Sequence, residues 1–234
     1  HAPAPGGAAV TTASPAPALV GPRDAVARLA SSRRTELVLL LAVIASSTII
    51  TWFRVPGPHR DRVWAEDANV FLIQAIDHGP WAEVFRGYAG YQQFTPRIVE
   101  GIIWPFFDLA HYGVLIFAIC SLLTGLTAGG VFWLTRDIVP WLPARLLLGM
   151  TTAILPLAEQ ETVGNLADIH TYAMWLAPWL LLYRPRNWGT SAGWAVVMWV
   201  LVMTEIQVVF FVFLIAFGLR RRDRKAWPIF GAFL

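Results

Sequence analysis

The sequence predicts an all-α membrane protein in which several helices cross the bilayer. Hydrophobic residues make up 56% of the 234 residues and charged residues only 14%, whereas a soluble domain carries about a quarter charged residues. The apolar residues come in long continuous runs, which is typical of transmembrane helices. The formal charge is only +3 and the arginines lie beside apolar runs, so composition argues against a nucleic-acid-binding protein.

The chain divides by composition into a tail and a membrane domain. Residues 1–35 are rich in Ala, Pro and Gly and are predicted to be a disordered cytoplasmic tail. Residues 36–234 form the predicted transmembrane domain, with spans at about 36–53, 111–134, 143–157, 171–183, 192–203 and 206–219. Because the chain stops within an apolar run, we expect it to be an incomplete piece of a longer protein.

Basic residues predict which side of the membrane each loop faces, because Lys and Arg are retained in the cytoplasm. The first apolar run follows a group of arginines, Arg23, Arg28, Arg33 and Arg34. This order predicts a cytoplasmic N-terminus in a plasma (inner) membrane. The loops 54–109 and 159–170 then lie on the extracytoplasmic side.

The apolar stretch 190–219 is predicted to be a hairpin of short helices rather than a single span. A single helix would deliver the basic residues 220–225 to the outer side, against the cytoplasmic bias of Lys and Arg. It would also hold Glu205 near mid-bilayer, where a lone carboxylate costs about 2.5–3.5 kcal/mol on insertion scales. A turn at Thr204–Gln207 removes both difficulties. Short spans in succession also suggest a cavity that opens to the outer side.

The outer loop 54–109 is predicted to carry amphipathic helices that lie in the membrane interface. Glu66–His78 has apolar residues at helical spacing and is followed by a Gly-Pro pair that ends a helix. Trp81–Phe85 is predicted to add another helical turn. Phe94–Phe107 again shows helical spacing, interrupted by one proline.

Glu66 and Asp67 are the predicted catalytic acids, because they follow Trp64 directly at the edge of an apolar segment. A carboxylate there could act as a general base on an acceptor hydroxyl or hold a divalent cation such as Mg²⁺ or Mn²⁺. Adjacent helical residues diverge by about 100°, so only one carboxylate is expected to face a cavity. The alternative interpretation is that the pair caps a helix N-terminus and complements its macrodipole.

A second set of polar side chains is predicted to bind substrate on the outer side: Arg97, Tyr88, Tyr91, Asn165, Asp168, His170 and Glu205. Arg97 would grip the phosphate of a lipid-linked substrate or, alternatively, snorkel to lipid phosphates. The tyrosines would stack on a sugar or belong to an interfacial aromatic belt. The spacing around His170 supports a metal site only loosely, and an interfacial histidine at a helix start is the alternative.

The succession of motifs resembles bacterial multi-pass proteins related to the GT-C glycosyltransferases. The motifs are W-A-E-D-A-N-V-F from Trp64, Y-A-G-Y from Tyr88, T-P-R from Thr95 and G-N-L-A-D-I-H-T-Y from Gly164. The resemblance implies a GT-C-like fold, a polyprenyl-phosphate sugar as donor, and Glu66 or Asp67 as the catalytic or metal-binding acid. It also implies that Arg97 meets the donor phosphate. Some GT-C families have Asp-Glu or Asp-x-Asp at this place, so the match is one of position and chemistry.

Together these features predict an inverting membrane glycosyltransferase with its active side outside the cytoplasm. It would transfer a hexose or pentose from a polyprenyl-phosphate-linked sugar to a hydroxyl of a glycan, lipid or protein, among membrane lipids and without nucleic acid. One alternative is a transporter or flippase for a lipid-linked glycan, which would need polar residues through the membrane thickness. Another is a scaffold in envelope synthesis, for which the acidic residues would be dispensable.

Overall fold

All the regular secondary-structure elements that the computed structural model describes are helices. It describes residues 33–64, 66–106, 108–155, 163–220 and 223–234, and within these ranges the only β-type pairing is an isolated bridge between Tyr88 and Tyr91. The predicted all-α class is therefore confirmed. The chain divides into two compact units, His1–Glu36 and Leu37–Leu234. Only residues 33–36 of the first unit are described, so most of the predicted tail lies outside the described residues.

In the described part of the chain, two helices are long and apolar enough to cross a bilayer. The first is α2 (Arg33–Arg54), and the second is α6 (Tyr112–Leu134), flanked by the short turns η2 (Leu109–His111) and η3 (Thr135–Asp137). At 1.5 Å per residue, each of the two long helices extends for roughly 33 Å. Their bounds lie close to those of the predicted spans 36–53 and 111–134.

Shorter helices occupy the remaining apolar runs. They are α7 (Leu142–Ile154), α9 (His170–Leu182), α10 (Trp188–Thr204), η5 (Ile206–Val212), α11 (Phe213–Arg220), η6 (Arg224–Ala226) and α12 (Trp227–Phe233). The stretch 190–219 is not one helix, because α10 ends at Thr204 and Glu205 has an extended backbone, with φ −139° and ψ 105°. The Glu205 carboxylate accepts a hydrogen bond from the backbone N–H of Gln207 at 2.7 Å and so caps the next helical segment.

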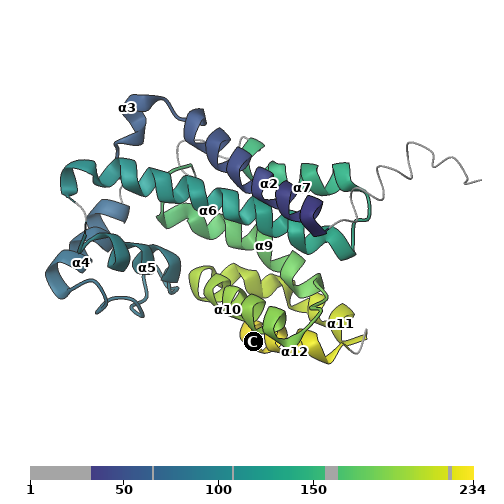
Figure 1. Cartoon of the computed structure of the whole chain (residues 1–234). Helices are drawn as coiled ribbons and strands as arrows, with labels where there is room; N and C mark the ends of the chain where they lie inside the picture. The colour runs from purple at the N-terminus through teal and green to yellow at the C-terminus, as the bar shows by residue number, and fades with distance from the viewer. Residues whose placement is uncertain (1–32, 65, 107, 156–162, 221–222) are drawn as a thin grey trace, which may run out of the picture. The chain divides into compact units, whose positions relative to one another are not determined.

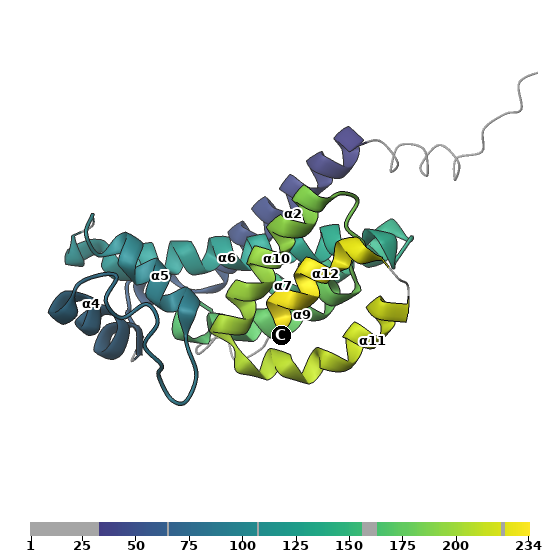
Figure 2. The same cartoon turned by 90° about the horizontal axis from the view of Figure 1, so that it is seen from below.

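Helix α6 is central to one part of the second unit, with α7 and α9 packed against it (Figure 1). A second group forms where α10 packs against α12, and α9 joins the two groups through contacts with α10 and α11 (Figure 2). The largest apolar core lies in this second group and includes the fully buried side chains of Leu180, Met198 and Ile229.

The segment between α2 and α6, which is the predicted outer loop, folds as short helical pieces at one end of α6 (Figure 1): α3 (Gly57–Arg60), η1 (Asp67–Leu72), α4 (Ile73–His78) and α5 (Phe94–Ile103). The element η1 is a π-helical turn that continues directly into α4, which ends at Gly79 with φ +95°. The predicted helical turn at Trp81–Phe85 is wrong, since this segment forms hydrogen-bonded turns. Six residues between a Gly-Pro pair and Gly87 are too few to form a stable helix in isolation.

Close packing of α6 against α2 depends on glycine. A Cβ added to Gly125 would lie 2.6 Å from the backbone carbonyl oxygen of Ile44 and would also overlap the Thr48 hydroxyl. A Cβ on Gly129 would overlap the Ile44 side chain. Small residues at these positions allow the two backbones to approach closely, as in other apolar helix pairs.

We expect Gly125→Ala to destabilise the protein by about 1–3 kcal/mol, because a backbone carbonyl cannot move aside as a side chain can. Thermal unfolding of the purified protein measures the effect. Gly193→Ala in α10 is the matched control, since nothing lies within 4 Å of an added Cβ there. This control should leave the midpoint unchanged or raise it, because Ala favours a helix more than Gly does. Equal midpoints for the two variants would contradict the packing argument.

Candidate functional site

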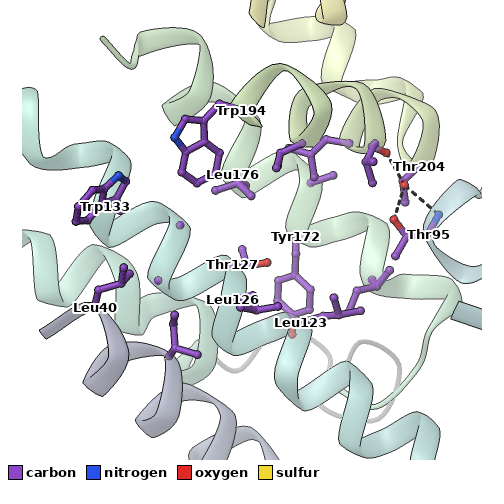
Figure 3. Close-up of a pocket in the computed structure, with 18 residues that line it drawn as sticks. Leu40, Thr95, Leu123, Leu126, Thr127, Trp133, Tyr172, Leu176, Trp194 and Thr204 are labelled. Atoms are coloured by element: carbon purple, nitrogen blue, oxygen red, sulfur yellow. Dashed lines mark hydrogen bonds between the residues drawn. The ribbon is translucent and has the colours of Figure 1, made fainter. Parts of the chain in front are cut away.

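An apolar cavity of about 520 Å³ lies between α2, α6, α9 and α10 (Figure 3). Most of its lining consists of aliphatic side chains, glycine and the two indoles of Trp133 and Trp194. The hydroxyl-bearing lining residues are Thr95, Thr127, Tyr172 and Thr204. Figure 3 shows Thr95 and Thr204 together on one side of the cavity, away from Trp133 and Leu40. The cavity therefore has a purely apolar end and a polar end.

The polar end is lined by a threonine pair that joins α5 to the end of α10. The Thr204 hydroxyl donates to the carbonyl of Val200 at 2.7 Å, so it acts as acceptor toward Thr95. Thr95 approaches it with its own hydroxyl at 2.7 Å and with its backbone N–H at 3.2 Å. These bonds fix the start of α5 next to the break between α10 and η5, where Glu205 lies.

Two polar residues, His170 and Glu205, directly follow the lining residues Ile169 and Thr204 in sequence. Together with three further polar residues they form a group that we call the His170 cluster: Asn165, Asp168, His170, Glu205 and Tyr91. The Glu205 carboxylate pairs with Nδ1 of His170, and Oδ1 of Asp168 lies 3.6 Å from Nε2 of His170. The amide of Asn165 donates to the other Asp168 oxygen at 2.7 Å. The Asp168 carboxylate raises the pKa of His170 most, and the charge of Glu205 raises it further against the lowering effect of burial. Five of the predicted substrate-binding residues thus come together.

The Tyr88-Ala89-Gly90-Tyr91 motif is a tight turn that delivers Tyr91 to this cluster. Ala89 and Gly90 have φ of +51° and +94°, and the backbone groups of Tyr88 and Tyr91 exchange hydrogen bonds of 2.7 and 3.1 Å. Such left-handed backbone is uncommon outside glycine and often marks a functional loop. The Tyr91 ring meets the His170 ring edge-on at 6.0 Å, whereas the Tyr88 ring packs against Phe71 instead.

Asp67 lies behind the loop that carries the cluster. Its side chain is fully buried, and its two carboxylate oxygens accept the backbone N–H groups of Leu166 and Ala167 at 2.7 and 2.8 Å. These residues lead into η4 (Ala167–Ile169), which is followed directly by His170. Burial raises the pKa of Asp67 to about 7, although the two backbone hydrogen bonds lower it. Asp67 therefore holds the loop in place, and its predicted catalytic role stays a prediction.

A divalent cation at Glu66 and Asp67 finds little support in the arrangement of ligands. Both Asp67 oxygens already accept backbone N–H groups, whereas Ca²⁺- or Mg²⁺-type ions need free oxygen ligands. Within the described ranges, no group of three or more His, Cys, Asp or Glu side chains is arranged to hold a metal ion. Glu66 is half-buried, and it is the more accessible member of the pair. The predicted cation site stays a prediction.

Arg97 lies apart from the cluster, between α5 and the η1–α4 segment. It is 3% exposed, donates from Nη1 to Gln74 at 2.9 Å and lies over the Phe71 ring at 5.2 Å. Its Nε and Nη2 atoms have no hydrogen-bond partner among the described residues. Burial lowers the pKa of Arg97. Its predicted contact with a phosphate stays a prediction, because its contacts in the structure are to Phe71 and Gln74.

A buried pair of an acid and a phenol, which was not predicted from the sequence, lies near Asp67. Glu100 on α5 is 1% exposed and accepts a hydrogen bond from the hydroxyl of Tyr112, the first residue of α6. Burial raises the pKa of Glu100 to about 8, more than the hydrogen bond from Tyr112 lowers it. Helical spacing could have revealed this residue, since Phe94, Arg97 and Glu100 share the buried face of α5.

Comparison with known proteins adds no relative: no family model, curated protein or solved structure matches this chain. The resemblance to GT-C glycosyltransferases therefore stays a prediction. Residues 156–162, which include the acidic end of the predicted outer loop, lie outside the described residues.

Replacing Asp67 tests its structural role. Asp67→Ala leaves the buried N–H of Leu166 without its acceptor, which costs about 1–3 kcal/mol. For a chain of this size we expect the thermal midpoint to fall by about 2–4 °C for each kcal/mol. Glu66→Ala is the neighbouring control and should unfold near the wild-type midpoint. An unchanged midpoint for Asp67→Ala would show that the loop does not depend on this carboxylate.

Glu100 predicts a pH dependence of stability with a definite sign. Because its pKa rises from 4.5 to about 8 on folding, the folded protein holds a proton that the unfolded chain releases. The contribution of this proton to the free energy of unfolding has its full value below about pH 4.5. It decreases as the pH rises toward 8, by up to about 1.4 kcal/mol per pH unit. Asp67, whose pKa is raised to about 7, also lowers the stability as the pH rises, but only up to about pH 7.

The Glu100→Gln variant separates the two acids. It keeps an acceptor for Tyr112 but does not titrate, so its thermal midpoint should fall less between pH 7 and 8 than the wild-type midpoint does, the remaining fall coming from His170, whose pKa is also raised. Tyr112→Phe retains the carboxyl group and should retain this fall. If the Glu100→Gln variant lost as much stability as the wild type over that interval, the prediction for Glu100 would be wrong.

Proposed function

We propose that this chain is an integral membrane glycosyltransferase that uses a polyprenyl-phosphate-linked sugar and transfers it to an acceptor hydroxyl on the extracytoplasmic side of the plasma membrane. The observation that carries this proposal is the apolar cavity whose polar end adjoins the His170 cluster. Ile169 and Thr204 line the cavity, and His170 and Glu205 are the next residues along the chain. An apolar chain and a reactive polar head group would therefore find matching surroundings side by side.

Exposed apolar side chains support a membrane location. Large hydrophobic residues are exposed along α2, α10, η5 and α11, including Phe53, Val196, Phe210 and Phe213. A soluble monomer rarely exposes apolar surface over several neighbouring helices, and lipid tails would cover it without penalty. The apolar lengths of α2 and α6 agree with this location.

The size and lining of the cavity support a lipid-linked substrate. Its volume of about 520 Å³ is within the range of small-molecule sites, roughly 300–1,000 Å³. The apolar lining would accept isoprenoid units, whereas a free sugar would lose its hydrogen bonds to water there. The same lining disfavours the alternative of a transport path for a polar glycan, which needs polar groups through the membrane thickness.

An assay of sugar transfer catalysed by the full-length protein in membranes tests the proposal. We expect radiolabel to move from a polyprenyl-phosphate hexose or pentose to membrane-bound acceptors, and Thr127→Trp to reduce the rate at least about tenfold by filling the cavity. Leu122→Trp is the control, because Leu122 lies on the exposed side of the same helix, α6. It should transfer at the wild-type rate.

Two outcomes would contradict the proposal. If the wild type transfers neither sugar, a scaffold in envelope synthesis becomes the better explanation. If both tryptophan variants transfer at the wild-type rate, the cavity does not hold the donor.

A further inference from the structure

The side chain of Glu205 is fixed by two interactions at the break between α10 and η5. It is only 3% exposed, and Oε1 accepts the backbone N–H of Gln207 at 2.7 Å. The other oxygen pairs with Nδ1 of His170. With both oxygens engaged, Glu205 holds the imidazole in one orientation, as a buried carboxylate orients the histidine of an acid–base pair in hydrolases.

The opposite edge of the His170 ring is the accessible one. Nε2 lies 3.6 Å from Oδ1 of Asp168, which is longer than a direct N–H···O hydrogen bond of about 2.7–3.2 Å. The His170 and Asp168 side chains are 19% and 35% exposed, in contrast to the buried Glu205. A hydroxyl group can therefore approach Nε2 beside Asp168.

The charges around His170 suit a group that accepts a proton. Glu205 faces it from the α10–η5 junction, Asp168 from η4, and the ring of Tyr91 from the tight turn before α5. Within the described residues, the ion-pair and ring contacts of His170 involve no Lys or Arg side chain. The pKa of His170 is raised by both carboxylates, so the imidazolium is stabilised once it forms.

We propose that His170 is the general base that activates the acceptor hydroxyl, with Glu205 as the positioning residue behind it. This assignment rests on the proposed glycosyltransferase function and gives the chemistry to a different part of the chain from Glu66 and Asp67. Asp67 is fully buried and both its oxygens accept backbone hydrogen bonds, so it cannot reach an acceptor without releasing the loop.

The proton and the bonds balance in a single displacement. The acceptor hydroxyl gives its proton to Nε2 of His170, and its oxygen forms a bond to the anomeric carbon of the donor. The bond between that carbon and the phosphate oxygen breaks, and its electron pair leaves with the polyprenyl phosphate. Attack on the face opposite the leaving group inverts the anomeric centre. The imidazolium, paired with Glu205 and Asp168, then releases the proton to solvent.

The test measures the transfer rate of the full chain in membranes from pH 5.5 to 9, with a radiolabelled polyprenyl-phosphate hexose or pentose as probe. The wild-type rate should rise with pH through a midpoint above the ordinary histidine pKa of about 6.5, because the base must be unprotonated. His170→Asn should lose about 100-fold or more in rate. Glu205→Gln and Asp168→Asn should lower the rate and also move the midpoint to lower pH, since each removes a carboxylate that raises the pKa of His170.

The shift in midpoint distinguishes positioning from a merely structural role, which would reduce the amount of folded protein and leave the midpoint in place. Chemical modification provides a second measurement if His170→Asn does not fold. In a background where His1, His59, His78 and His111 are replaced by Gln, diethyl pyrocarbonate should abolish transfer. Hydroxylamine, which removes the modification, should restore it.

The possible results separate this assignment from the proposed function. Transfer by the wild type together with an unchanged rate and pH profile in His170→Asn would overturn the assignment of His170 alone. Activity that survives diethyl pyrocarbonate in the replaced background would do the same. A wild type that transfers neither sugar would overturn the proposed function and, with it, this assignment.

Discussion

The hydrogen bonds between the Asp67 carboxylate and the backbone N–H groups of Leu166 and Ala167 fix the loop that carries the His170 cluster. They join two segments that lie 99 and 100 residues apart in sequence. The loop they hold runs into η4 and α9, and its position decides where Asp168 and His170 point. A single buried side chain thus connects the segment before α4 to the polar groups next to the cavity.

Several buried polar groups in this apolar chain find their hydrogen-bond partners at the ends of helices. A buried group without a partner costs free energy, so polar side chains gather where backbone groups or other side chains are available. The ends of helices provide such partners, and the Thr95–Thr204 pair, the Glu205 cap and the Asp67 bonds all lie at helix ends. Within α6, the buried hydroxyls of Ser121 and Thr124 donate to backbone carbonyls of their own helix, and apolar packing fills much of the remaining core.

The same separation of polar ends from apolar interiors creates the cavity. The short helices leave space beside the long α6. The lining residues of α6 there include glycine and threonine, whose small side chains fill little of this space. The result is an apolar space adjacent to an imidazole held between two carboxylates. Neither feature alone indicates chemistry, since apolar cavities and histidine ion pairs both occur in structural proteins. Their proximity is what supports the proposed transfer from a lipid-linked donor.

The sequence by itself determined the helical class, the long apolar helices and the break at Glu205. These follow from hydrophobic runs, charge bias and the cost of a carboxylate within an apolar helix, all of which are local properties. It did not determine which acids would meet. Asp67 is buried and accepts a backbone hydrogen bond from Leu166, and His170 pairs with Glu205, because segments distant in sequence pack together. Only the tertiary structure decides such contacts, since side-chain partners depend on how helices pack.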